Sequence, residues 1–554
     1  MAPSALVQLC VSPYRGLAFA VAARYSRADA ERTLHRPFFE SNELDAEVPP
    51  FAVRHWFWIG LAVAVAAALR FTNLGAWSLW IDEAHSWRDA TIAWDALDSE
   101  RKLYALTFLL LRALLAGHWI SGDEASLRLP FALVGVATVP LLAMCGRRVI
   151  GRWPAVLAAW FCALNPWHVF WSQNARGYVL MFAFAVIASN RGAKFADTQR
   201  LRDFFATMVA VGVSALCHPT GATQALGVIA FMVLRTFPSL RGRVLVRIAV
   251  GAVAIAVLLP WIVAFLPFQG FLNAKNDPSL LHFAQTTAYY YMPVVLLAAA
   301  VGLLLAWRQI GRERALLLAC LWLVPFLVLT TIGAFVAKVT ARYSLCTLPV
   351  VTWLAAYACC RVAAAAAGER RSWPRLAMAT LLPLVLLAQY SHEAITYHVE
   401  RFGDRARWRQ ACEFVTQEAG GGRVRVLTLN HPTVLYYLRP RHWEAREDAY
   451  PDLQVVPLLD DGPKKGKDEA ERVVCEPGAA NFLRYQLGEA RSAGAKFFVL
   501  VTLPELAEID TKSDADPAGA ILATLQQQFD LVLHLPCWVG PKDESIYVYA
   551  PKPE

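Results

Sequence analysis

Two neighbouring stretches of the chain decide the class of fold: LPFALVGVATVPLLAMCG at residues 129–146 and WPAVLAAWFCALNPWHVFW at residues 153–171. Neither stretch contains an Asp, Glu, Lys or Arg. Each comes close to the run of about 20 apolar residues with which a helix crosses a bilayer. A short basic turn with Arg147, Arg148 and Arg152 separates them. This pattern predicts two antiparallel membrane-spanning helices.

The composition extends this prediction to most of the chain. Of the 554 residues, 57% are hydrophobic and 18% are charged, and the mean hydropathy is +0.38. Ordinary globular proteins carry about 25% charged residues, so a purely soluble protein is excluded. Only seven of the 44 acidic residues lie between residues 103 and 392, whereas 25 follow residue 392. With the two stretches above, further apolar runs predict about eleven spans, at residues 55–71, 177–190, 204–217, 219–235, 245–267, 291–307, 314–336, 343–361 and 374–391.

The sidedness of the protein depends on the apolar stretch Leu103–Trp119, because counting it as a span reverses every later loop. As a helix it is about 25 Å long, shorter than a bilayer core, and it carries Arg112 in its middle. If it does not cross, all arginine clusters fall on one side, which the positive-inside rule assigns to the cytoplasm. We therefore expect an interfacial or re-entrant helix and an external C-terminus. The clusters are Arg147, Arg148 and Arg152; Arg191, Lys194 and Arg200; Arg241, Arg243 and Arg247; Arg308, Arg312 and Arg314; and Arg370, Arg371 and Arg375.

Three regions follow from these patterns. We expect a cytoplasmic extension at residues 1–54, a transmembrane domain at 55–392 with a first external loop at 73–128, and an external α/β domain at 393–554. In the last region, strand-like runs alternate with helical patterns, as in a small α/β domain. Its three cysteines allow one disulfide. The strand-like runs are Val424–Leu429, Phe497–Thr502, Leu531–Leu535 and Ile546–Tyr549, the helical patterns are Ala406–Glu418 and Ala518–Phe529, and the cysteines are Cys412, Cys475 and Cys537.

Two classes of partner are not favoured. The formal charge of +9 arises from arginines in short loops between apolar runs, and no basic face with interleaved aromatic residues appears, so we expect no nucleic acid partner. None of the 11 cysteines has the C-x-x-C spacing of a zinc site, so a structural metal is not expected either.

The first external loop carries the candidate chemistry. Asp82 and Glu83 form an adjacent acidic pair soon after the first span, in the sequence Leu-Trp-Ile-Asp-Glu-Ala. A carboxylate among Trp and Ile side chains is partly desolvated, which predicts a raised basicity suited to accepting a proton from a hydroxyl. A solvated loop position is the alternative interpretation of this pair. Trp80, Trp87 and Trp94 recur every seven residues, as on one face of a helix at the headgroup level or packed against other protein.

Cations at the same membrane edge complement this acidic pair. Arg176 lies in a very short loop between two apolar runs, and Arg342 opens another run. Charged groups at this depth are costly unless paired, so they mark an ionic ligand or an ionic partner. Snorkelling to headgroup phosphates is the alternative. Lys338, Tyr343 and His218 lie at the same predicted level.

These residues resemble the polytopic GT-C glycosyltransferases of the protein-mannosyltransferase and aminoarabinose-transferase type. The resemblance covers roughly residues 55–360, with the motifs in the expected order. A weaker similarity follows in the C-terminal region at Arg407-Trp408-Arg409. The motifs are Asp82-Glu83, Arg128-Leu129-Pro130, Gly146-Arg147-Arg148, Asn165-Pro166, the run Ser172–Tyr178, and Arg342-Tyr343 leading to Leu348-Pro349.

The resemblance implies an α-helical polytopic membrane enzyme that moves a sugar from a polyprenyl-phosphate carrier to a glycan, lipid or protein acceptor. Transfer would occur on the outer face of the membrane, with inversion at the anomeric carbon. By position in the motifs, Asp82 would be the base with Glu83 as its neighbour, and Arg176 and Arg342 would hold the carrier phosphate. By analogy, Tyr178, His218 and Tyr343 would shape the site.

Two positions depart from the family pattern. The chain has Glu100-Arg101-Lys102-Leu103-Tyr104 where the family usually has His-Pro-Pro-Leu-Tyr, and Lys102 is itself a candidate for a phosphate contact. Asn174 stands where the family often carries an acid, so we expect no divalent metal and no other cofactor besides the lipid-linked donor.

Two other functions remain open from the sequence. One is a transporter of phosphate-bearing lipid or polysaccharide, although no internal repeat of the kind common in transporters appears. The other is a relative that binds a polyprenyl lipid without catalysis. The Ala- and Arg-rich composition is compatible with a bacterial inner membrane, with the C-terminal domain in the periplasm.

Overall fold

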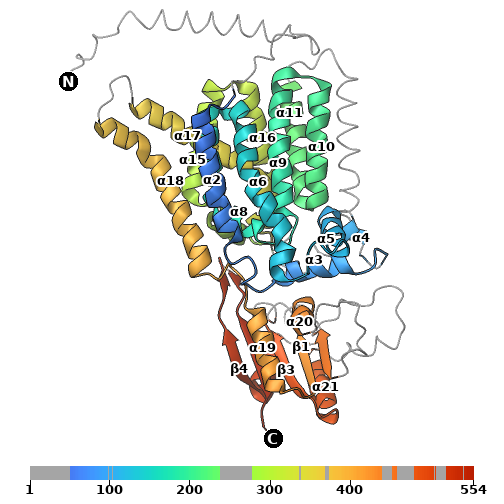
Figure 1. Ribbon diagram of the computed structural model, residues 1–554. Coiled ribbons are helices and arrows are strands. Elements are labelled where there is room, and N and C mark those ends of the chain that lie inside the picture. Colours follow the sequence, from blue (N-terminus) through green and yellow to red (C-terminus); the bar gives the residue numbers. More distant parts are fainter. Residues whose placement is uncertain are drawn as a thin grey trace, which may run out of the picture.

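The computed structural model describes residues 50–95, 97, 99–102, 104–236, 278–335, 338–367, 373–438, 452–457, 479–503, 506, 520–540 and 542–553. Nearly all of the predicted N-terminal extension, the predicted span at 245–267, the clusters at 241–247 and 370–371, and Cys475 lie outside the described residues. Within the described parts, a helical bundle is followed by a sheet near the C-terminus (Figure 1).

The bundle is built from apolar helices whose buried faces form one large core. Its main members are α2 (Val53–Phe71), α6 (Glu124–Ile150), α7 (Arg152–Leu164), α9 (Tyr178–Thr198), α10 (Leu201–Cys217), α11 (Thr223–Thr236), α15 (Pro293–Gln309), α16 (Arg312–Phe335), α17 (Leu348–Ala367) and α18 (Trp373–Val399). Short helices join them: α8 (Pro166–Ser172), η1 (Pro219–Ala222), α14 (Leu280–Tyr291) and η3 (Ala341–Thr347).

Within the described residues, five helices are long and apolar enough to cross a membrane, and one bent pair is a candidate for a sixth. The chain is therefore a polytopic membrane protein, while the predicted number of about eleven spans stays a prediction. The continuous span predicted at 153–171 is wrong, because the helix stops at Leu164 and α8 begins at Pro166. Pro166 lacks an N–H donor, and the side chain of Asn165 caps the new helix by accepting from His168 N.

A second break shapes the bundle between α14 and α15. The two helices meet at an angle of 83°. Met292 between them has a φ of 59°, and Pro293 opens the second helix, where its missing N–H costs nothing. The span predicted from residue 291 therefore corresponds to α15, and α14 lies nearly perpendicular to it at its N-terminal end.

The stretch Leu103–Trp119 forms only the short helix α5 (Leu106–Ala116). It lies beside α3 (Ile81–Thr91) at the end of the bundle nearest the sheet, with the one-turn helix α4 (Ser99–Lys102) next to it (Figure 1). Arg112, in the middle of α5, donates to the carbonyls of Asp89, Ala90 and Ile92. Its charge thus covers the C-terminal end of α3, where a helix dipole favours a cation.

The arginine-rich turns gather at the opposite end of the bundle. Arg314 forms two hydrogen bonds to the carboxylate of Asp197, at 2.6 and 2.7 Å, and a third to the carbonyl of Arg148 at 3.3 Å. Three turns that are far apart in sequence therefore meet at one end, as the prediction of a common side requires.

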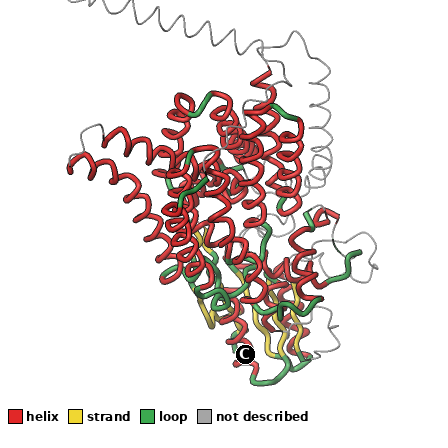
Figure 2. The backbone as a smooth tube through the Cα atoms, turned by 45° about the horizontal axis from the view of Figure 1, so that its top comes forward, coloured by secondary structure: helices red, strands yellow, loops and turns green. Residues whose placement is uncertain are grey.

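A five-stranded sheet follows the bundle, in the order β2-β1-β3-β7-β4. Strands β1, β2 and β3 are parallel, whereas β7 is antiparallel to both β3 and β4. Figure 2 shows the strands gathered at the end of the molecule that carries the C-terminus. The strands are β1 (Val424–Thr428), β2 (Leu453–Pro457), β3 (Lys496–Val501), β4 (Phe529–Leu535) and β7 (Ile546–Pro551), and a separate hairpin joins β5 (Trp538–Val539) to β6 (Lys542–Asp543).

Helices cover both faces of this sheet. Helix α19 (Trp408–Ala419) packs in one apolar layer with α20 (His431–Leu438), and α21 (Ala479–Ser492) packs in the other with α23 (Ala520–Gln528). The predicted α/β arrangement is present, although β2, α20 and α21 were not among the predicted elements. Both described cysteines of the region, Cys412 and Cys537, are free.

Helix α20 connects the sheet region to the first loop. Tyr437 accepts from the backbone N–H of Leu79 at 2.6 Å and donates to Glu124 at 3.0 Å. Tyr436 packs edge-on against Trp87 at 5.2 Å. The interpretation of the tryptophans as one membrane-facing stripe is therefore wrong, because Trp87 packs on protein and α3 ends before Trp94. The C-terminal region is instead docked directly on the loop that carries Asp82 and Glu83.

Candidate active site

Asp82 lies in the first turn of α3 with two arginines beside it. The Nη1 atom of Arg342 is 3.9 Å from Oδ2 of Asp82, and both side chains are 27% exposed. Arg176 donates to the backbone carbonyl of Asp82 at 3.4 Å and to the hydroxyl of Ser86 at 3.3 Å. The structure therefore brings together three residues that are far apart in the chain: Arg176 follows Asp82 by 94 positions, and Arg342 follows Arg176 by 166. One carboxylate beside two guanidinium groups is a site suited to an anion.

The expected rise in the basicity of Asp82 is wrong. Burial raises the pKa of Asp82, but the neighbouring charges of Arg176 and Arg342 outweigh burial and leave its pKa below the ordinary value of 3.8. The carboxylate is thus ionised at neutral pH. The sequence argument included desolvation but did not include the cations that only the fold brings into contact.

Arg342 is positioned by the short helix α14. Tyr291 on α14 bonds to the carbonyl and hydroxyl of Ser344, at 2.7 and 2.9 Å, and to the hydroxyl of Thr347 at 2.8 Å. Thr286, one turn and a half earlier, accepts from the backbone N–H of Ala341 at 3.0 Å. These contacts hold η3 on both sides of Arg342. Its guanidinium lies over the rings of Trp80 and Tyr343, at 5.8 and 5.1 Å.

Arg176 is held by the tight connection between α8 and α9. Gly177 packs so close to the end of α10 that a Cβ atom there would lie 2.0 Å from the carbonyl oxygen of Cys217, so only glycine fits. Gln173, three residues before Arg176, donates to the carbonyls of Leu69, Arg70 and Thr72. The connection is thereby fixed to the end of α2, and Arg176 reaches α3 from a rigid support.

Glu83 has a different environment from Asp82. Its side chain and that of Arg128 are both fully buried, and two hydrogen bonds of 2.7 and 2.8 Å join them. Ala175 N donates to the same carboxylate at 2.9 Å, and Arg405 lies 3.5 Å away. Burial raises the pKa of Glu83, but the charges of Arg128 and Arg405 outweigh burial and leave this pKa below its ordinary value. Both oxygens are occupied, so the geometry favours a positioning role for Glu83 over the chemical role expected beside Asp82.

The three residues expected to shape the site form an aromatic wall next to Arg342. Tyr178 stacks on Trp171 with ring centroids 3.8 Å apart, and His218 lies 4.0 Å from Tyr178 on the side facing Tyr343. Tyr343 is 6.4 Å from His218, nearly parallel to it, and its hydroxyl accepts from Arg342 at 3.2 Å. The wall therefore continues directly into the cation cluster.

Comparisons with known proteins identify the fold. Residues 108–263 match the family model described as dolichyl-phosphate-mannose-protein mannosyltransferase. ArnT from Cupriavidus metallidurans, solved bound to undecaprenyl phosphate, has a similar structure, with a TM-score of 0.51 and 15% identity over 91% of this chain and 100% of that chain. The chain has the GT-C glycosyltransferase fold. The archaeal oligosaccharyltransferase AglB from Archaeoglobus fulgidus, in complex with an inhibitory peptide and a dolichol-phosphate, has a TM-score of 0.53 and 11% identity over 90% of this chain and 74% of that chain. None of the curated proteins matches this chain in sequence.

Two predicted residues of this GT-C chain lie outside the cluster around Asp82. Lys102 donates to the backbone carbonyl of Asp95 at 3.4 Å and lies over the ring of Trp94 at 5.9 Å. Lys338 is exposed in the segment before η3. Their expected contacts with a phosphate therefore stay predictions.

Sequence reasoning missed three residues of the candidate site. Trp80 donates its indole N–H to Asn174 Oδ1 at 3.0 Å and so faces Arg342 in a fixed orientation. His85 follows Asp82 by one turn, and burial lowers its pKa to about 3, so the ring is neutral. Arg405 comes from the C-terminal region. The Trp at the start of the helix was a usable signal, whereas Arg405 had none, because its contact with Glu83 spans more than 300 residues.

Asn174, where the family often carries an acid, is buried and serves to orient Trp80. Among the described residues, no group of three or more His, Cys, Asp or Glu side chains is arranged to hold a metal ion. The absence of a divalent metal nevertheless stays a prediction.

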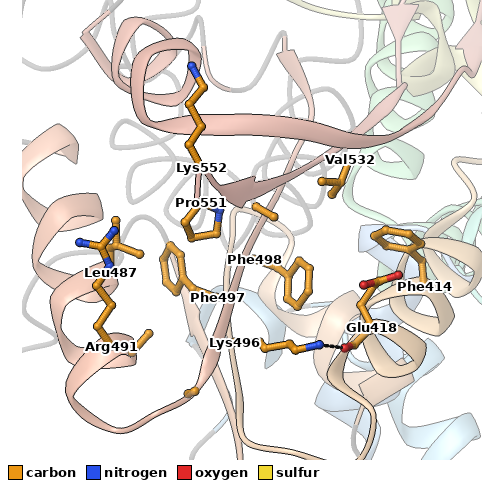
Figure 3. A pocket seen from close by; sticks show the side chains of 13 residues that line it. Phe414, Glu418, Leu487, Arg491, Lys496, Phe497, Phe498, Val532, Pro551 and Lys552 are labelled. Atoms are coloured by element: carbon orange, nitrogen blue, oxygen red, sulfur yellow. Dashed lines mark hydrogen bonds between the residues drawn. The ribbon is translucent and has the colours of Figure 1, made fainter. Parts of the chain in front are cut away.

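One cavity lies beside the candidate site, and a second lies away from it. The first, of about 80 Å³, is lined by Trp80, Tyr290 and Arg342 and, from the chain after α18, by Asp404, Val539 and Glu544. A more open cavity of about 830 Å³ lies at the far end of the sheet, lined by Phe497, Phe498, Lys496 and Lys552 (Figure 3). In that cavity Lys496 donates to the carbonyl of Glu418, and Lys552 to the carbonyls of Gln526 and Gln527. Only the smaller cavity adjoins Arg342.

Proposed function

We propose that the protein is an inverting glycosyltransferase that moves a sugar from a polyprenyl-phosphate donor to an acceptor hydroxyl. The observation that carries this proposal is the cluster of Asp82, Arg342 and Arg176 at one end of the helix bundle. The ionised carboxylate of Asp82 lies 3.9 Å from the guanidinium of Arg342. The guanidinium of Arg176 donates a hydrogen bond to the backbone carbonyl of Asp82 in α3. A base and two phosphate-binding groups are the parts that this reaction requires.

In the proposed reaction the acceptor oxygen attacks the anomeric carbon as the bond from that carbon to the phosphate oxygen breaks. The electron pair of the broken bond leaves with polyprenyl phosphate, whose added negative charge Arg342 and Arg176 stabilise. The acceptor proton passes to Asp82. Because the attack comes from the face opposite the phosphate, the configuration at the anomeric carbon inverts.

The low pKa of Asp82 fits this sequence of events. In the free protein, the two arginines lower its proton affinity below that of an ordinary carboxylate. A bound phosphate adds negative charge beside the same arginines and so offsets part of their effect on Asp82. We infer that donor binding raises the basicity of Asp82, which makes the base stronger only when the donor is present.

The ligands in the two structural neighbours support the class of donor. ArnT was solved with undecaprenyl phosphate, and AglB with dolichol-phosphate and a peptide. At 15% and 11% identity, these neighbours are similar to this chain in fold. The donor class for this protein therefore rests on the arginine cluster, and the neighbours make a polyprenyl phosphate the first lipid to test.

We also propose that the Asp82 cluster and the C-terminal domain lie on the outer side of a bacterial inner membrane. The contacts of Arg314 with Asp197 and the carbonyl of Arg148 support this, because basic turns favour the cytoplasmic side and meet at the other end. Gly151, in the turn between α6 and α7, is exposed and suits a topology reporter. The reporter should give a cytoplasmic signal, and an external signal would reverse the proposed orientation.

The main test is the variant Asp82→Asn. General base catalysis contributes about 10²–10⁴-fold, so transfer should fall by that factor while the binding of undecaprenyl phosphate is kept. Glycan and lipid mass spectrometry of cells with and without the protein identifies the product whose formation is then measured.

Asp95→Asn is the matched control, since Asp95 is an exposed acid of the same loop. It should leave transfer unchanged. Unchanged transfer in Asp82→Asn would remove this residue from the mechanism. Binding of the lipid with no product in the wild-type protein would favour the transporter or the non-catalytic binder.

A further inference from the structure

A strained turn in the connection between α18 and the sheet faces the small cavity. Its sequence is Arg-Phe-Gly-Asp-Arg at residues 401–405, and three successive residues, Phe402, Gly403 and Asp404, have φ values of 49°, 67° and 51°. Two of them are not glycine, so the turn costs conformational free energy. Such strain persists only where the surroundings over-determine it, and it concentrates at ligand-binding positions.

The surroundings fix this turn on both sides. A Cβ atom on Gly403 would lie 2.3 Å from the ring of Trp77, so the turn packs directly on the first loop. Arg405 donates to the carbonyls of Gly403 and Gln173 and lies 3.5 Å from Glu83. Asp404, the residue before Arg405, lines the cavity.

Asp404 is a buried carboxylate with unused hydrogen-bonding capacity. Its side chain is 9% exposed. Oδ2 accepts from the hydroxyl of Tyr289 at 3.1 Å, whereas Oδ1 is 3.7 Å from Arg401 Nε and has no hydrogen bond within the described part of the chain. Buried acceptors are nearly always hydrogen-bonded, so Oδ1, which has only the long ion pair with Arg401, has capacity to accept a hydrogen bond from a ligand.

The cavity has the size and lining of a site for a small polar ring. Its volume is about 80 Å³. One water requires about 10–15 Å³ on such a measure, so the cavity has room for several waters or for one small ring. Aromatic faces come from Trp80, Phe170 and Tyr290, and carboxylates come from Asp404 and Glu544.

Arg342 joins this cavity to the Asp82 cluster. The guanidinium that lies 3.9 Å from Asp82 also lines the cavity. If Arg342 held a phosphate, a group bonded to that phosphate could therefore extend into the cavity, where Asp404 and the β5–β6 hairpin form part of the lining. Glu544 follows this hairpin and forms an ion pair of 2.6 Å with Lys542.

We propose that this cavity holds the sugar of the donor and that Asp404 selects the sugar by accepting hydrogen bonds from its hydroxyl groups. The C-terminal region, through the 401–405 turn and the β5–β6 hairpin, is thus the specificity-determining part of the site. This inference rests on the proposed function, and it adds which residues distinguish one sugar from another.

The test compares binding of bare undecaprenyl phosphate with binding of undecaprenyl-phosphate monosaccharides carrying a hexose, a pentose or an amino sugar, on the full chain in nanodiscs. The wild-type protein should bind at least one glycosylated lipid more tightly than the bare phosphate. Asp404→Asn should reduce that preference about tenfold, as expected for losing a charged hydrogen-bond acceptor, and leave affinity for the bare phosphate unchanged. Glu544→Gln should reduce it in the same direction.

Glu393→Gln is the matched control, because Glu393 also pairs with Arg401 but does not line this cavity. It should keep the preference. An equal loss of both affinities in Asp404→Asn would assign Asp404 a structural role and overturn the inference. The inference also fails if no glycosylated lipid binds more tightly than bare phosphate. A preserved preference without sugar transfer would instead contradict only the proposed function.

Discussion

Asp82 and Glu83 are neighbours in the chain, yet their environments have little in common. Asp82 is 27% exposed and has two arginines beside it, the nearer guanidinium 3.9 Å away. Glu83 is fully buried, with both oxygens hydrogen-bonded to Arg128. Successive residues on a helix point about 100° apart, which is enough to direct one carboxylate toward Arg342 and the other into the protein.

In the proposed reaction, this difference separates the reacting group from a supporting one. A carboxylate with all partners in place is held by the fold and has no capacity left for a substrate. A carboxylate with cations nearby but no short hydrogen bond to them is available to a ligand. Exposure and unused hydrogen-bonding capacity therefore distinguish the two acids, although their sequence context is the same.

The largest effect is expected from breaking the buried pair. Arg128→Met removes the two hydrogen bonds to Glu83 and the donors to the carbonyls of Leu74, Trp77 and Ser78. Removing one partner of a buried ion pair costs about 3–5 kcal/mol, because the remaining charge stays buried. Thermal unfolding of the detergent-purified protein should show a large drop in midpoint or a loss of folded protein.

Arg176→Met is the matched comparison on the Asp82 side. Arg176 makes only long contacts with α3, of 3.3 and 3.4 Å, so its loss should change the unfolding midpoint little and lower affinity for undecaprenyl phosphate. If both variants destabilise the protein equally, the distinction between a binding cluster and a structural cluster is wrong.

A smaller effect should come from Asp404, which is buried like Glu83 but incompletely paired like Asp82. Burial raises its pKa to about 6 from 3.8. The folded state therefore holds this proton more tightly than the unfolded state, so stability falls as the pH rises from about 4 to about 6. A shift of this size corresponds to at most about 3 kcal/mol, fully expressed above pH 6.

Asp404→Asn should remove this dependence. At pH 7.5 the variant is expected to unfold at a higher temperature than the wild type, and the difference should shrink as the pH is lowered toward 4.5. Unfolding midpoints measured across this range check the prediction. A difference that grows on acidification would mean that Asp404 is fully paired in the folded protein.

Much of the architecture could be predicted from the sequence because apolar runs have a physical meaning of their own. The runs at 129–146 and 177–190 and the strands at 424–429 and 497–502 all correspond to elements of the structure. The break at Asn165-Pro166 was visible as a motif, yet its effect on the span was not predicted. Helix α20 was not predicted, because its eight residues carry only a short apolar pattern.

The candidate site was partly visible for the same reason. Asp82, Arg176 and Arg342 stood out because charges beside apolar runs are costly and few. The roles of Arg405 and Asp404 were not visible, because residues 401–405 look like an ordinary charged loop. The direction of the pKa shift at Asp82 was also beyond the sequence, since it depends on the distances of two distant arginines.

The sequence by itself determined that the chain enters a membrane, where its apolar helices lie, and that its acids are concentrated outside them. These properties depend on local composition, since each helix satisfies its own backbone hydrogen bonds. Only the tertiary structure decided which of the two adjacent acids keeps unused hydrogen-bonding capacity, and that a turn more than 300 residues away contacts the other one, Glu83. Such decisions depend on Coulomb interactions and packing across space, which the order of residues along the chain does not specify.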